Sequence, residues 1–173
     1  MTNTPGPVPG SDTINLLAGL APDSRLAQLR TERPDVALHA EGSYQALLEP
    51  ADPGGVSRLE REMIALRVAV LTPSAPVAAW HRDRLRKLGA TNDWIAAIES
   101  HPAGSTLSAR DVAILRHTDL LTVAPAEASP AAIADLKAVG LSPRDIVTIA
   151  QLITFETFQV RVLAGLRLLA EEK

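Results

Sequence analysis

Two ionisable residues, Glu62 and His81, stand nineteen positions apart in the part of the chain best suited to acid–base chemistry. His81 lies in "LTPSAPVAAWHRDRLRKLG", on a predicted helix whose apolar stripe is formed by Val77, Leu85 and Leu88. On a helical wheel these three residues lie within about 40° of the imidazole. An ionisable ring in such a stripe lowers the stability of the core unless a partner compensates it.

Glu62 is placed to be that partner. It stands beside the apolar stripe of the preceding predicted helix, near Leu59 and Leu66. If the two helices fold back on each other at "TPSAP", the two side chains lie roughly one helical turn apart along the axis. Burial disfavours the imidazolium and a carboxylate favours it, so we expect the pKa of His81 near working pH, where acid–base catalysis is efficient.

Both residues also have ordinary structural explanations. A histidine on an apolar helix face is often a core residue that donates to a backbone carbonyl. Glu62 follows Arg58 by four residues, which is the spacing of an exposed helical ion pair of little energetic value. The residues alone leave both explanations open.

Helix start and stop signals recur along the chain, and strand patterns are missing. The clearest start is the capping box of Ser57 and Glu60, which predicts a helix to about Leu71. The next helix is predicted over about 75–88, with Gly89 as its left-handed cap. Further helices are predicted within 22–35, at about 35–49, 91–98, 109–122 and 130–139, and from 143 to the C-terminus. The predicted fold class is all-α, a multi-helix bundle in a single domain over 13–173, after a flexible arm over 1–12.

The predicted last helix is apolar nearly all round over 146–169. Such a helix is buried in its domain or covered by another subunit, and we expect both. The chain is therefore predicted to be a homo-oligomer, either a dimer, a trimer or a hexamer. The polar residues inside this helix either make hydrogen bonds at the interface or line a pocket; they are Gln151, Glu156, Gln159 and Arg161.

Composition narrows the function classes. Of 173 residues, 46% are hydrophobic and 3% aromatic, so a globular core of aliphatic side chains is expected. The net charge is −3 and "RDRLRK" fits a solvated helix face, so nucleic-acid and membrane partners are not expected. Neither a membrane span nor a secretory signal is seen, which predicts a cytoplasmic location. The histidines show no ligand-pair spacing, so neither a metal nor another cofactor is expected.

The block over 57–98 resembles the carboxymuconolactone decarboxylase family, which includes the alkylhydroperoxidase D-like (AhpD-like) proteins and a peroxidase-related branch. The peroxidase members share a Glu, eleven residues, Cys-x-x-Cys, three residues, a His, and a Gly eight residues further on. This chain has Glu62, eleven residues, the tetrapeptide Ser74 to Val77, three residues, His81, and then Gly89. The register matches without a gap.

The resemblance implies an AhpD-like fold with the family core at about 50–125. In the peroxidase members it implies a cysteine that is activated by a Glu–His relay, attacks the peroxide and is resolved by a second cysteine. Ser74 and Val77 occupy those two positions here, and the chain has no cysteine at all. A serine does not cycle through sulfenic acid and disulfide, so thiol peroxidase activity by this chain alone is not expected. The decarboxylase branch lacks the cysteines, keeps a Glu and a His nineteen residues apart, and acts on a small lactone acid by proton transfer.

Three functions follow. The first is a lyase-like or isomerase-like enzyme that moves a proton on a small organic acid, lactone or carbonyl compound through Glu62 and His81. Trp80 is then a pocket wall or a packing residue. Arg67 either holds a substrate carboxylate or faces solvent or a neighbouring subunit, and Ser74 as a nucleophile ranks lower. The second function is a non-catalytic scaffold or partner of a cysteine-bearing paralogue, and the third is peroxidase activity with a thiol donated by another molecule.

Overall fold

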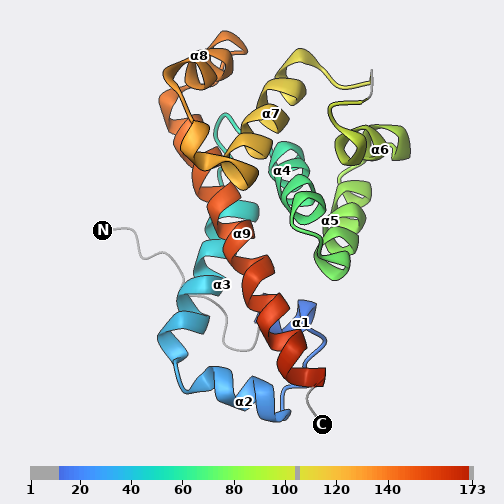
Figure 1. Ribbon diagram of the computed structural model, residues 1–173, viewed down its shortest axis with the longest axis vertical. Coiled ribbons are helices and arrows are strands. Elements are labelled where there is room, and N and C mark those ends of the chain that lie inside the picture. Colours follow the sequence, from blue (N-terminus) through green and yellow to red (C-terminus); the bar gives the residue numbers. More distant parts are fainter. Residues whose placement is uncertain (1–11, 104–105, 172–173) are drawn as a thin grey trace.

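The computed structural model describes residues 12–103 and 106–171, and within them every regular element is helical (Figure 1). The α-helices are α1 (Thr13–Leu17), α2 (Arg25–Thr31), α3 (Pro34–Leu48), α4 (Arg58–Leu71), α5 (Ala75–Lys87), α6 (Asn92–Ser100), α7 (Ala109–Val123), α8 (Pro130–Ala138) and α9 (Pro143–Glu171). A short 3₁₀ turn, η1 (Pro125–Glu127), joins α7 to α8. The all-α prediction is confirmed.

The short helix α1 is the element that the sequence did not predict. Asp12 was assigned to the flexible arm, but its carboxylate caps this helix by accepting a hydrogen bond from the backbone N–H of Asn15. Ile14 and Leu17 then reach the core. Five residues are too few to display a helical period, so no sequence pattern marks this helix. The rest of the predicted arm, residues 1–11, lies outside the described residues.

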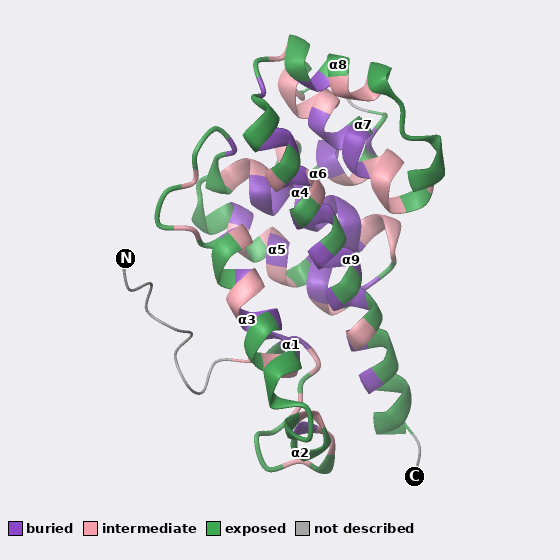
Figure 2. Ribbon diagram, turned by 90° about the vertical axis from the view of Figure 1, so that its left-hand side faces the viewer, coloured by how far each residue is buried: buried purple, intermediate pink, exposed green. Residues whose placement is uncertain are grey.

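The helix α4 lies at the centre of the molecule, packed against α5, α6, α7 and α9 (Figures 1 and 2). The spacing of its leucines predicts one apolar stripe, but every residue from 61 to 69 is buried. Three charged side chains of this helix, Arg61, Glu62 and Arg67, are therefore inside the protein and need partners there.

The longest helix, α9, runs along most of the length of the molecule and contacts α3, α4 and α7 (Figure 1). By length and composition alone its 29 residues are sufficient to cross a membrane. However, half of its most apolar 18-residue window is buried inside the protein, as in the core helix of a globular domain. Its C-terminal part, beyond the body of the bundle, is exposed on most sides (Figure 2).

The side chain of Arg61 ties together the loop between α3 and α4. Arg61 donates hydrogen bonds to the carbonyls of Leu47, Pro53 and Val56, at 2.6, 2.7 and 2.9 Å. Its guanidinium therefore closes the loop against the first turn of α4. This closure fixes where α4 begins and so where Glu62 lies.

Gly55 in this loop packs directly on the start of α9. A Cβ atom at Gly55 would lie 2.4 Å from Oδ2 of Asp145. That carboxylate is held in place, because it accepts hydrogen bonds from the backbone N–H and the hydroxyl of Ser142 at 2.9 and 2.7 Å. We expect Gly55→Ala to lower the free energy of unfolding in urea by about 1–3 kcal/mol through this overlap. Gly42→Ala is the matched control, because a Cβ there meets nothing within 4 Å; equal stabilities of the two variants would contradict the prediction.

Candidate active site

The candidate site lies where α4 and α5 fold back on each other. Helix α5 begins after Ser74, has Pro76 in its first turn, and carries basic residues in its last turn, where they complement the helix dipole. Gly89 follows its end with a φ of +90°, a conformation that favours glycine. These signals set the length of α5 and therefore place His81 opposite α4.

The structure brings Glu62 and His81 together. The Nδ1–H of His81 donates to Oε2 of Glu62 across 2.7 Å. His81 is 0% exposed and Glu62 is 1% exposed, so the hydrogen bond is sealed from water. The ordinary explanation for Glu62 is wrong, because Arg58 donates instead to the carbonyl of Pro50.

The apolar stripe around His81 differs from the predicted one at one position. Val77 and Leu85 are fully buried beside it, as expected, but Leu88 is 44% exposed. Leu88 is the C-terminal cap of α5, and the chain turns away at Gly89. Leu88 therefore does not lie on the buried face that helical spacing predicts for it. Ala78 completes that face instead.

A second carboxylate reaches His81 from the other side. Oε2 of Glu156, on α9, lies 3.5 Å from Nε2 of His81, and Glu156 is 0% exposed. This distance suits an ion pair and is long for a hydrogen bond. Among the described residues, neither oxygen of Glu156 has a hydrogen-bond partner. The imidazole thus lies between two buried carboxylates that come from different helices.

Arg84 links this buried group to the surface. Its Nε–H donates to Oε1 of Glu62 at 2.5 Å, and its Nη2 lies 2.7 Å from Oε1 of Glu49. The side chain of Arg84 is 24% exposed. Its guanidinium also lies 5.9 Å from the ring centre of Tyr44 and 5.8 Å from that of Trp80. The indole N–H of Trp80 donates to the hydroxyl of Tyr44, so Trp80 packs and orients Arg84 here.

The electrostatics favour a charged ring at His81. Burial is the largest influence and lowers its pKa, but the attraction of Glu156 and Glu62 together outweighs it and raises the pKa to about 9. The expectation of a value near working pH is therefore wrong, because it counted one carboxylate where the fold supplies two. Arg84 follows the same pattern: burial is the largest single influence and lowers its pKa, but Glu62, Tyr44 and Glu49 together outweigh it and raise the pKa.

Arg67 belongs to a separate, structural group. Its guanidinium forms a two-pronged pair with Asp119, at 2.6 and 2.8 Å, and donates to the carbonyls of Ile98, Glu99 and His101. Arg67 is buried, so it neither faces solvent nor holds a substrate carboxylate as predicted. The reason is the central place of α4, which turns every side of that helix towards another helix.

The positions that match the lost cysteines have no chemical partner. Val77 is fully buried in the hydrophobic core, and Ser74 is the N-cap residue of α5, where its side chain makes no capping hydrogen bond. In the described structure no hydrogen bond joins Ser74 to His81. A serine nucleophile activated by this histidine is therefore not supported.

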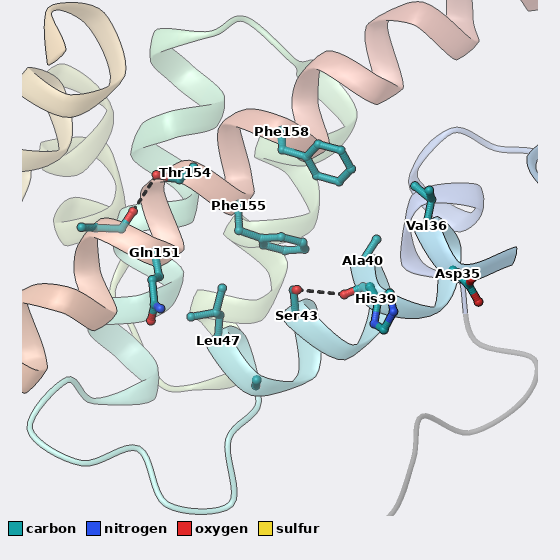
Figure 3. Close-up of a pocket in the computed structure, with 12 residues that line it drawn as sticks. Asp35, Val36, His39, Ala40, Ser43, Leu47, Gln151, Thr154, Phe155 and Phe158 are labelled. Atoms are coloured by element: carbon teal, nitrogen blue, oxygen red, sulfur yellow. Dashed lines mark hydrogen bonds between the residues drawn. The ribbon is translucent and has the colours of Figure 1, made fainter. Parts of the chain in front are cut away.

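Two surface pockets flank the site. A groove of about 870 Å³ lies between α3 and α9, and Phe155, Phe158 and Leu47 are among its apolar lining (Figure 3). A smaller pocket of about 390 Å³ contains Arg84 and the basic side chains of Arg58 and Lys87. Neither Glu62 nor His81 lines these pockets. Arg84 is the residue that belongs both to a pocket and to the buried group.

Residues 34–119, from α3 to most of α7, match the sequence profile of the Carboxymuconolactone decarboxylase family. This segment of the chain belongs to that family. It contains Glu62, His81 and Arg84, whereas Glu156 lies outside it. A search of curated proteins finds no match.

Solved structures share the fold over most of this chain. An uncharacterized peroxidase-related protein from Silicibacter sp. TM1040 has a TM-score of 0.72 and 23% identity, covering 88% of this chain and 78% of that one. An AhpD-core, peroxidase-related protein from Ralstonia eutropha JMP134 has a TM-score of 0.70 and 20% identity, covering 94% of this chain and 88% of that one. A protein of unknown function from Agrobacterium tumefaciens, described as an AhpD candidate for antioxidant defence, has a TM-score of 0.70 and 22% identity, covering 83% and 94%. The AhpD-like fold is therefore confirmed, and at these identities the likeness shows the fold alone.

Sequence reasoning missed two members of the site. Arg84 was assigned to a solvated face, although it stands three residues after His81, where helical neighbours meet. Arg82 of the same stretch is likewise paired, with Glu99 of α6. Glu156 was singled out as a polar residue of an apolar helix, but nothing in the sequence identifies its partner.

We expect the stability of the protein to depend on pH through His81. Its folded-state pKa of about 9 lies above the ordinary histidine value of 6.5, so the stabilisation is complete below about pH 6.5 and is lost as pH rises through 9. At about 1.4 kcal/mol per pKa unit, the free energy of unfolding falls by up to about 3 kcal/mol over this interval. Urea unfolding at a series of pH values measures the fall. His117→Asn is the control that should keep it, because burial lowers the pKa of His117; a flat profile for the wild type would contradict the prediction.

Proposed function

We propose that this chain is a cysteine-free acid–base protein that moves a proton on a small organic acid, lactone or carbonyl compound. The observation that carries the proposal is the hydrogen bond of 2.7 Å between His81 and Glu62, on an imidazole that two carboxylates keep protonated. An imidazolium is a proton donor at neutral pH, so His81 acts first as the acid of the pair. No cofactor takes part in this chemistry.

The proton leaves through Glu62. The Nδ1–H of His81 points at one oxygen of Glu62, and the other oxygen binds Arg84 at the edge of the basic pocket. A proton that passes to Glu62 therefore stands one side chain away from a solvent-facing pocket. This route requires Arg84 to move, because its side chain lies between Glu62 and the pocket.

The charge of the pocket supports an acidic substrate. Arg58, Arg84 and Lys87 line it, against the single carboxylate of Glu49. A substrate carboxylate that replaces Glu49 on Arg84 stands beside the guanidinium that holds Glu62. Small anionic acids and lactones are therefore the preferred substrate class, and the reaction is of the lyase or isomerase type.

The burial of the pair favours a second candidate, a non-catalytic scaffold or partner of a cysteine-bearing paralogue. Both side chains are sealed, and the pockets described above do not reach them. In that case the buried charges serve only to fix the packing of α4, α5 and α9. Peroxidase activity would require a thiol from another molecule, because this chain has none.

Solvent-deuterium incorporation separates the two candidates. We expect the wild type to exchange the hydrogen next to the carbonyl carbon in members of a panel of small carboxylic acids, lactones and ketones, followed by proton NMR in D₂O. In this exchange Glu62, a carboxylate once it has given its proton to the carbonyl oxygen, takes the proton from the neighbouring carbon, and a deuteron from solvent replaces it. His81→Asn and Glu62→Gln should each slow this exchange by about 100-fold or more, as removal of an acid–base group does. His117→Asn is the matched control and should leave the rate unchanged, because His117 is buried on α7, lines a different pocket, and is not among the hydrogen-bond or ion-pair partners of Glu62 and His81 in the described residues.

Exchange in no member of the panel, combined with loss of stability in His81→Asn, would reject the enzyme and support the non-catalytic candidate. Deuterium exchange that persists in both site variants would show that Glu62 and His81 do not carry out the proton transfer. Glu62→Gln keeps the size of the side chain, so it gives an answer even where His81→Asn folds poorly.

The assembly proposed for the chain is a homo-oligomer that packs through α3 and α9. Apolar side chains are exposed along both walls of the groove between these helices, with Val36 on one and Phe158 on the other (Figure 3). Leu168 and Leu169 continue the apolar surface to the end of α9. A second copy that presents the same two helices covers these side chains symmetrically.

We expect Phe158→Asp to shift the chain to a smaller species in sedimentation velocity, because it places a charge in the apolar groove. Val123→Asp is the matched control. Val123 is an exposed apolar residue at the end of α7, outside the groove, so its replacement should leave the assembly intact. A wild type that sediments as a monomer at concentrations of tens of micromolar would contradict the proposed oligomer.

A further inference from the structure

Glu156 is a buried carboxylate that the proposed reaction does not use. It stands in the middle of α9, is 0% exposed, and has no hydrogen bond to either oxygen within the described residues. The nearest cationic partner is Nε2 of His81, at 3.5 Å, and that nitrogen also has no hydrogen-bond partner. An unpaired carboxylate at such a place is strongly destabilising, so its partner has to be identified.

The charges of the buried group indicate that the partner of Glu156 is His81. Glu62 binds both His81 and Arg84, so without Glu156 it is the one buried carboxylate beside two cations, while the carboxylate of Glu49, which is 36% exposed, pairs with Arg84 from the surface. The positive charge of His81 then lacks a full counter-charge, and burial favours the neutral ring. With Glu156 present, two carboxylates alternate with two cations and the group is neutral. Glu49 lies at the exposed end and serves only Arg84.

We propose that Glu156 is a positioning residue that keeps His81 doubly protonated and directs its Nδ1–H at Glu62. The inference rests on the proposed proton transfer for its functional meaning. The claim that a carboxylate on α9 sets the protonation of a ring on α5 holds whether or not the protein is an enzyme.

The arrangement also defines how the imidazole ring of His81 regains its proton. When Nδ1 gives its proton to Glu62, His81 becomes neutral and Glu62 becomes a carboxylic acid. Glu62 then passes the proton to the substrate beside Arg84 and is a carboxylate again. A proton from solvent returns by the same route to Nδ1, while Nε2 keeps its proton towards Glu156 throughout. Every proton that leaves is thus replaced at the same atom, and Glu156 remains an anion.

Other charged groups around His81 do not compete with Glu156. Helix α4 contributes Glu62, and α1 carries no charged residue over Thr13–Leu17. On α6, Glu99 pairs with Arg82, and on α9 the other fully buried polar residue, Gln159, is uncharged. Tyr44, from α3, faces Arg84 and Trp80.

The test is an NMR titration of the His81 ring in the full chain labelled with ¹⁵N-histidine, with the resonance identified by its loss in His81→Asn. We expect both ring nitrogens of the wild type to be protonated at pH 7. In Glu156→Gln, which keeps the shape and removes the charge, the pKa of His81 should fall by at least about one unit, a tenfold loss of proton affinity. Gln159→Met, on the same helix, is the matched control and should leave the titration unchanged.

Three results would overturn the inference: a neutral His81 ring in the wild type at pH 7, an unchanged titration in Glu156→Gln, or an equal fall in Gln159→Met. Glu156→Asp keeps the charge and should retain most of the proton affinity, which separates the charge from mere packing. The wild-type spectrum gives an answer by itself if the variants do not fold. A protein that passes this test and fails the deuterium exchange retains the inference and loses the enzymatic proposal.

Discussion

The alternating charges of Glu156, His81, Glu62 and Arg84 join three helices through the centre of the molecule, and Glu49 ends the series at the surface. Buried charges of this kind contribute little net stability, because desolvation opposes their attraction. Loss of one member, however, leaves its neighbour charged and unpaired. The packing of α4, α5 and α9 is therefore tied to the protonation of one imidazole, the group to which we assign the proton transfer.

The central position of α4 explains why the network exists. A helix that is covered on every side has to satisfy each of its charged side chains internally, and α4 does so in three different ways. Arg61 donates hydrogen bonds to backbone carbonyls in and beside the loop between α3 and α4. Arg67 pairs with Asp119. Glu62 is the one of the three that is paired with a histidine, whose pKa of about 9 means that it loses its charge only as the pH rises through that value. The position to which we assign chemistry is thus distinguished from Arg61 and Arg67 by its titratable partner, His81.

Local rules predicted the helices, since capping boxes, prolines and the glycine at 89 act within a few residues. They also predicted that Glu62 and His81 meet, because both lie on helices joined by a short turn. What they missed depends on the three-dimensional packing: Glu156 arrives from a helix about 75 residues further along the chain. For the same reason Arg67 was assigned to a surface, since the leucine spacing of α4 cannot reveal that other helices cover its remaining sides.

The replacement of the cysteine pair changes the surroundings of the relay as well as its chemistry. Val77 contributes an apolar side chain to the core one turn before His81, at a position where the family resemblance implies a thiol. The ring is thereby kept dry on that side, which strengthens its interactions with both carboxylates. A relay that serves a thiolate has to accept the proton of the thiol, whereas the imidazole here is already protonated at neutral pH, because two buried carboxylates raise its pKa to about 9. A ring in that state suits the proposed proton donation better than the activation of a buried nucleophile, and the chain has no thiol to activate.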